Sequence, residues 1–107
     1  MKKKPVINYD IEKVDLSTID LSKMRLNSAN EERIKPVIKA VRKEVERAMT
    51  LHGAMRNAHE AYAVLLEEVD ELWDEVKKNS KTRDPLKMRE EAIQVAAMAV
   101  RMIIDVL

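Results

Sequence analysis

Two segments of this chain place acidic side chains at the spacing of one helical turn. The first reads EExxE, from Glu67 to Glu71, and the second reads EExxQ, from Glu90 to Gln94. Residues three apart on a helix project from the same face, so the carboxylates of Glu68 and Glu71 leave the helix side by side. Glu68 also borders an apolar stripe and should be partly buried. Paired carboxylates at the border of a core repel each other unless a cation lies between them, so this spacing predicts a metal site.

The chemistry of such a site follows from its ligand atoms, which are oxygens. If the two segments pack antiparallel, Glu68 and Glu71 approach Glu91 and Gln94. An all-oxygen set favours Mg²⁺, with Mn²⁺ as the other candidate, over Zn²⁺. The chain contains no cysteine, which excludes a thiolate site and a disulfide framework. Because Mg²⁺ usually keeps several waters and binds substrate phosphates, the pattern suits phosphate chemistry.

Three helices must position these residues. Apolar residues at helical spacing predict helices over about 30–52, 59–76 and 85–107. Asn57 is the expected N-cap of the second helix, with Glu60 reaching back as in a capping box, and Asp84 with Pro85 marks the start of the third. Gly53 is expected to end the first helix in a left-handed conformation.

The second and third helices carry more apolar surface than one small domain easily buries. The second has an apolar stripe made of Tyr62, Leu65, Leu66, Val69, Leu72, Trp73 and Val76. The third is apolar except for one polar stripe, formed by Glu91, Gln94, Arg101 and Asp105. A polar stripe on a buried helix needs partners: either a cation, or a salt bridge between Arg101 and a glutamate. We therefore predict an all-α fold, a three-helix subunit that a second copy completes into a four-helix-type bundle.

Composition limits the remaining possibilities. The chain has 107 residues and fits one helical domain, residues 30–107, preceded by an extended arm, residues 1–29. The net charge of +1 and an aromatic content of 3% give no support to nucleic-acid binding. The most apolar segment, residues 92–107, is too short and too polar to span a bilayer. The amino terminus lacks the apolar run of a signal peptide, so we expect a cytoplasmic protein.

The acidic segments and their surroundings resemble a known family. AHEAYAVLLEEVDELWDEVK and RDPLKMREEAIQVAAMAVR are similar to the MazG-like branch of the all-α NTP pyrophosphohydrolases. In that family ExxE is followed by ExxD. Glu68 and Glu71 match the first pair, Glu91 matches the first residue of the second pair, and Gln94 replaces the usual Asp. The resemblance implies Mg²⁺-dependent hydrolysis of nucleoside triphosphates to monophosphate and pyrophosphate, by a homodimer or homotetramer.

The resemblance assigns roles to residues of this chain. Glu68, Glu71, Glu91 and Gln94 are the expected metal ligands, and Glu67 is expected to support them or to act as the base. Candidates for binding the substrate's polyphosphate are the basic residues Lys77, Lys78, Lys81, Arg83 and Arg101. Gln94 removes one negative charge from the family's metal site. The alternative is therefore a non-catalytic helical module that binds a nucleotide or a protein partner through a degenerate metal site.

Overall fold

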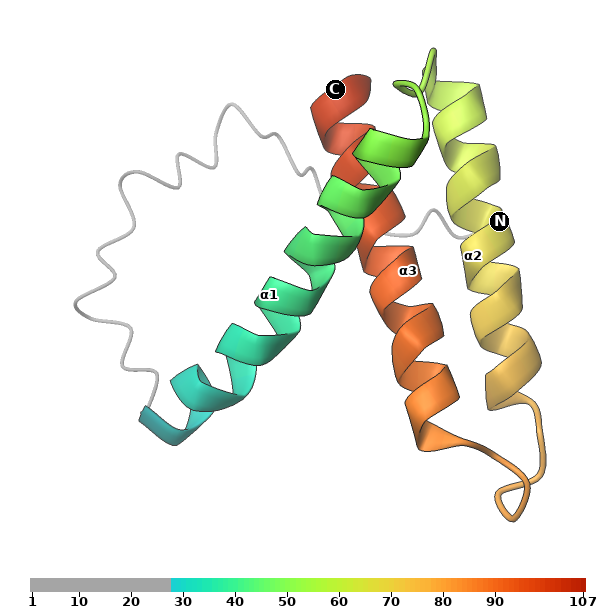
Figure 1. Ribbon diagram of the computed structural model, residues 1–107. Coiled ribbons are helices and arrows are strands. Elements are labelled where there is room, and N and C mark those ends of the chain that lie inside the picture. Colours follow the sequence, from blue (N-terminus) through green and yellow to red (C-terminus); the bar gives the residue numbers. More distant parts are fainter. Residues whose placement is uncertain (1–27) are drawn as a thin grey trace, which may run out of the picture.

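The computed structural model describes residues 28–107, and within them all regular structure is helical. The three helices are α1 (Ser28–Leu51), α2 (Ala58–Val76) and α3 (Pro85–Asp105) (Figure 1). The sequence-based prediction of three helices is confirmed, with α1 beginning two residues earlier than expected. The predicted arm lies outside the described residues, apart from its last two positions, which form the start of α1.

The third helix lies between the other two. α3 packs against both α1 and α2, and α2 runs antiparallel beside it (Figure 1). α1 contacts α3 through its C-terminal half, where Val45 and Ala48 are buried. Its N-terminal half diverges, which leaves Ile34, Val37 and Ile38 exposed. α3 is therefore the element that relates residues of α1 to residues of α2.

The core is small and is built from short or flexible side chains. Its buried members are Val45, Ala48, Met55, Ala61, Ala97 and Met98. Alanine at the helix contacts allows close approach, and methionine fills irregular gaps between helices. Within the described range no helix is long and apolar enough to cross a membrane.

The predicted start signals of α2 and α3 are confirmed. The side chain of Asn57 accepts a hydrogen bond of 2.8 Å from the backbone N–H of Glu60. Asp84 accepts one of 2.9 Å from the N–H of Leu86, and Pro85 occupies the first turn of α3. These acceptors satisfy backbone N–H groups that have no partner inside their own helix.

The prediction for Gly53 was wrong. No glycine in the structure has a positive φ, and a Cβ at Gly53 would meet nothing within 4 Å. α1 ends at Leu51 and the chain continues through an irregular connection, residues 52–57, in which the carbonyl of Gly53 accepts a hydrogen bond from Arg101. The connection after α1 is therefore held by a tertiary hydrogen bond and contains no left-handed glycine.

The apolar stripe of α2 is divided between two faces. Leu65 of the predicted stripe packs towards the core, together with Ala61 and Val64, which lie outside that stripe. On the outer side a row at helical spacing remains exposed, namely Tyr62, Leu66, Val69 and Trp73. Tyr62 and Trp73 are 60% and 58% exposed, so residues 28–107 leave this row uncovered.

Candidate metal centre

Three of the predicted ligands converge between α2 and α3. One carboxylate oxygen from each of Glu68, Glu71 and Glu91 lies within 4.8 Å of the others. Glu68 and Glu91 are half-buried, whereas Glu71 is exposed. This arrangement follows from the antiparallel packing of α2 on α3, which sets the EExxE segment opposite the EExxQ segment. We call these three residues the glutamate cluster.

The local structure explains why Glu68 is partly removed from water. Val64 and Leu65, one turn earlier on α2, pack against the core, so a residue at position 68 points towards the same face. Burial therefore raises the pKa of the Glu68 carboxyl to about 7, and the neighbouring charges of Glu71, Glu91 and Glu67 act in the same direction.

These electrostatics match what a divalent cation needs. Lys87 forms an ion pair with one member of the cluster, since its Nζ lies 3.6 Å from Glu91 Oε1. No described residue forms an ion pair with Glu68 or Glu71. In its metal-free form the cluster relieves its own repulsion by keeping a proton on Glu68. A bound cation would displace that proton and be held by oxygen ligands.

Gln94 of α3 lies close to Glu44 of α1. The Glu44 carboxylate accepts a hydrogen bond of 2.9 Å from Arg47 Nε. This hydrogen bond and, to a smaller extent, the polar side chain of Gln94 hold the pKa of the Glu44 carboxyl below its usual range, although burial opposes them. The residue that replaces the family's Asp thus lies beside a carboxylate of α1.

Sequence reasoning did not single out Glu44, the half-buried carboxylate of α1. The signal was present, because Glu44 lies three residues after Val41 and four before Ala48, on the face that packs against α3. A carboxylate on the inner face of a helix needs a partner, and Arg47, three residues later on α1, provides it.

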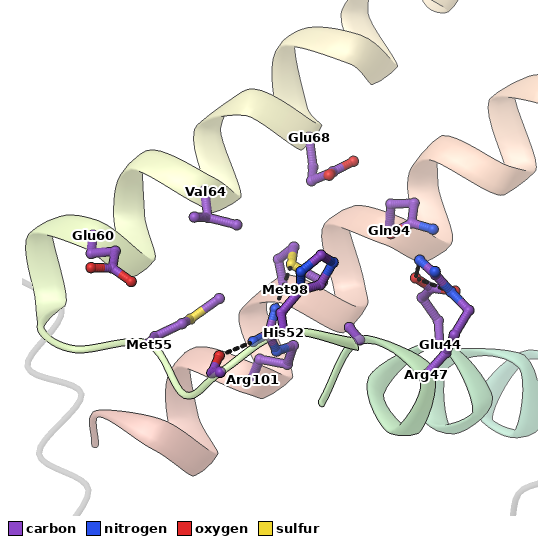
Figure 2. A pocket seen from close by; sticks show the side chains of 12 residues that line it. Glu44, Arg47, His52, Met55, Glu60, Val64, Glu68, Gln94, Met98 and Arg101 are labelled. Atoms are coloured by element: carbon purple, nitrogen blue, oxygen red, sulfur yellow. Dashed lines mark hydrogen bonds and ion pairs between the residues drawn. The ribbon is translucent and has the colours of Figure 1, made fainter. Parts of the chain in front are cut away.

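A pocket of about 320 Å³ lies beside the glutamate cluster, between the three helices. Figure 2 shows Glu44, Val64, Glu68, Gln94, Met98 and Arg101 around it. Glu68 belongs both to the pocket wall and to the cluster. A molecule in the pocket would therefore lie against the group that can hold a cation.

Arg101 is buried and connects α3 to residues 52–57. Its Nη2 donates to the carbonyl of Gly53 at 3.1 Å (Figure 2). The same Nη2 lies 4.0 Å from Asp105 Oδ2. Asp105 Oδ2 in turn accepts a hydrogen bond of 3.0 Å from the backbone N–H of Met55. The expected polar stripe on α3 does face inward. The ion-pair partner of Arg101 is Asp105, one turn along the same helix, rather than a glutamate of α2.

The other basic candidates lie at the opposite end of α2 from the pocket. Lys77 pairs with Asp74 and Lys78 with Glu75, both at 2.9 Å. Arg83 donates to the carbonyl of Lys78, and Lys81 is exposed in the connection to α3. Lys77 follows Glu68 by nine residues, about 13 Å along a helix. Their role in binding a polyphosphate stays a prediction, as does the role of Glu67, which is exposed beside the cluster.

Comparisons with protein-family models, with curated proteins and with solved structures found no match. The findings support a small all-α protein of three helices with a glutamate cluster that could hold a metal ion. The MazG-like resemblance rests on the sequence segments and motifs alone.

Proposed function

We propose that this protein is a MazG-like, Mg²⁺-dependent nucleoside triphosphate pyrophosphohydrolase. The observation that carries the proposal is the convergence of Glu68, Glu71 and Glu91 within 4.8 Å. These are the residues that the ExxE…ExxD pattern selects, and they come from two consecutive helices, α2 and α3. Three carboxylates this close to one another repel each other unless a cation lies between them, so their convergence is what a cation site requires.

The residues of this site have distinct roles in the proposed reaction. Glu68, Glu71 and Glu91 would hold Mg²⁺, with Mn²⁺ as a substitute, through carboxylate oxygens. The bound ion would offset the charge of the substrate phosphates and lower the pKa of a water molecule. Glu67 accepts the proton of the attacking water. The water oxygen bonds to the α-phosphorus as the bond to the leaving oxygen breaks, which gives nucleoside monophosphate and pyrophosphate.

A second copy of the chain is the proposed partner, giving a homodimer or homotetramer in the cytoplasm. The exposed rows on α1 and α2 support it, because isolated monomers seldom leave large contiguous apolar surface uncovered. Ile38 is 61% exposed and Trp73 58% exposed, on different helices. Covering them with a second three-helix subunit would complete the predicted bundle.

One observation favours a second candidate function. Position 94, the fourth of the family's acidic pattern, holds a glutamine beside Glu44 and offers only a neutral oxygen to a cation. A chain with a weakened metal site would serve as a non-catalytic module that binds a nucleotide or a protein. This candidate predicts no Mg²⁺-dependent turnover in a folded protein.

Product analysis separates the two candidates. The purified protein is incubated with a panel of canonical and modified NTPs and dNTPs, with and without Mg²⁺, beside the Glu71→Gln variant. Glu90→Gln is the matched control, because Glu90 is an exposed neighbour of the cluster and does not belong to it. The proposal expects monophosphate and pyrophosphate from wild type and control only, and only with Mg²⁺. Turnover that survives in Glu71→Gln, or no turnover at all, would reject it.

A further inference from the structure

The N-terminal half of α1 is a helix that nothing within residues 28–107 covers. Every residue from Ser28 to Lys39 is exposed. Helical segments of about a dozen residues are marginal in water unless one face is packed against something. Pro36 weakens this segment further, because it removes a backbone N–H from the helix interior. The helical state of this half therefore indicates a partner from outside residues 28–107.

An apolar groove with a positive charge marks where that partner would lie. α1 and α3 diverge towards their N-terminal ends (Figure 1), and an open pocket of about 770 Å³ lies on this side. Its apolar lining is Ile34, Pro36, Val37 and Ile38, and its charged lining is Arg33 of α1 and Arg89 of α3. Neither arginine has an ion-pair partner within residues 28–107. We call this pocket the α1 groove.

The chain itself contains a segment of matching chemistry. Residues 14–22, which read VDLSTIDLS, lie outside the described range. They carry four branched apolar side chains, two aspartates and no basic residue. Asp15 and Asp20 each stand between two of the apolar residues. An apolar segment with two negative charges complements an apolar groove with two cations that have no anion. We call residues 14–22 the acidic segment.

The acidic segment is tethered close to the α1 groove. Five residues, 23–27, join it to Ser28 and can span at most about 18 Å. Val37 follows Ser28 by nine residues, about 14 Å along α1. The tether is therefore long enough for the segment to turn back along its own α1. Tethering also gives it a far higher local concentration at this groove than a segment of another molecule has.

We propose that the acidic segment packs in the α1 groove of its own chain. Its apolar side chains cover the apolar lining, and its two aspartates approach the two arginines. Ile38 is 61% exposed, against 44% for Ile34 and 39% for Val37, so it lies at the outer edge and stays available to the second copy of the proposed assembly. The segment thus holds the diverging half of α1 against α3. This inference depends neither on metal binding nor on hydrolysis.

Disulfide cross-linking in the full chain tests the proposal, because the chain has no cysteine of its own. Ile19→Cys and, to allow for a second register, Leu16→Cys are each combined with Val37→Cys. The matched control is Lys39→Cys, two residues further along α1 and on the opposite side of the helix, so that the tether has nearly the same length.

The rate of disulfide formation within one chain decides the outcome. The proposal expects at least one position of the segment to cross-link about tenfold or more faster to Val37→Cys than to Lys39→Cys. Equal rates at the two sites would show a segment that does not occupy the groove, and would overturn the proposal. Cross-links that join two chains would place the segment on another molecule and would overturn it as well.

A charge exchange tests why this segment fits this groove. Arg33→Glu with Arg89→Glu sets like charges against the two aspartates and should slow the cross-linking about threefold or more. Adding Asp15→Lys and Asp20→Lys should restore the rate, because the charges are then opposite again. Both arginines are exposed, and circular dichroism checks that the helices are retained. A rate that none of these changes alters would overturn the assignment of the acidic segment to the groove.

Discussion

Gln94 on α3 lies beside Glu44 on α1, and its side chain helps to hold the pKa of the Glu44 carboxyl below its usual range. Glu91, one turn earlier on α3, meets Glu68 and Glu71 of α2. At position 94 an amide suits the neighbouring carboxylate of Glu44 better than a second carboxylate would, because an amide has N–H groups to donate.

Restoring the family's residue should therefore harm this chain. In Gln94→Asp a carboxylate replaces the donor beside Glu44, and we expect the free energy of unfolding to fall by about 1–3 kcal/mol at pH 7. Chemical denaturation measures the change. The double variant Glu44→Gln with Gln94→Asp reverses the donor and acceptor and should recover part of the loss. A Gln94→Asp protein as stable as wild type would show that the amide beside Glu44 does not contribute to stability.

Asp105 should be among the residues whose loss costs most stability. Its removal in Asp105→Ala deprives buried Arg101 of its nearby anion and the Met55 N–H of its acceptor, so we expect a loss of about 3 kcal/mol. Asp74→Ala is the matched control, because Asp74 forms an exposed ion pair with Lys77 and should change stability by less than about 1 kcal/mol. Similar thermal shifts for the two variants would contradict this assignment.

The raised pKa of Glu68 gives the metal-free protein a specific pH dependence. The folded pKa is about 7 and the ordinary value is 4.5, so between these pH values the folded protein holds a proton that the unfolded chain has released. The free energy of unfolding should therefore fall as the pH rises through this window. Denaturation at several pH values, without divalent ions, should show this slope in wild type and a smaller one in Glu68→Gln. Identical slopes would contradict the shift.

A charge introduced among the exposed apolar residues of α1 should weaken the proposed contact between subunits. Ile38→Glu places a carboxylate on the diverging half of α1 and should shift the protein towards monomer at micromolar concentration, because burying an unpaired charge is costly. Ser80→Glu adds the same charge in the exposed connection between α2 and α3 and should not. Light scattering measures both. A wild-type protein that is already a monomer would contradict the proposed assembly.

Features determined by nearby residues were predictable from the sequence. Asn57 and Asp84 act through backbone groups two or three residues away, and the helical repeat placed Glu68 beside Glu71. Antiparallel packing then brought Glu91 to them, which required only one assumption about the connection between α2 and α3. The convergence of the glutamate cluster was therefore predictable from the sequence.

Features determined by contacts between distant helices were not predictable in the same way. Gly53 was assigned a helix-ending role from its type alone, but its conformation follows from the hydrogen bond to Arg101. The outward row containing Tyr62 and Trp73 could not be told from the inward row, since helical periodicity shows that a face is apolar and not what covers it. Glu44 was missed because its burial depends on how α1 packs against α3, which the sequence of α1 alone does not reveal.

Cation binding by the glutamate cluster is the central claim, and isothermal titration with Mg²⁺ and Mn²⁺ in the absence of nucleotide tests it most directly. The account predicts one saturable site in wild type, weakened about tenfold or more in Glu71→Gln and unchanged in Glu90→Gln. It also predicts that binding below pH 7 releases a proton from Glu68. No saturable site in wild type, or the same affinity in Glu71→Gln, would contradict the assignment of Glu68, Glu71 and Glu91 as a metal centre.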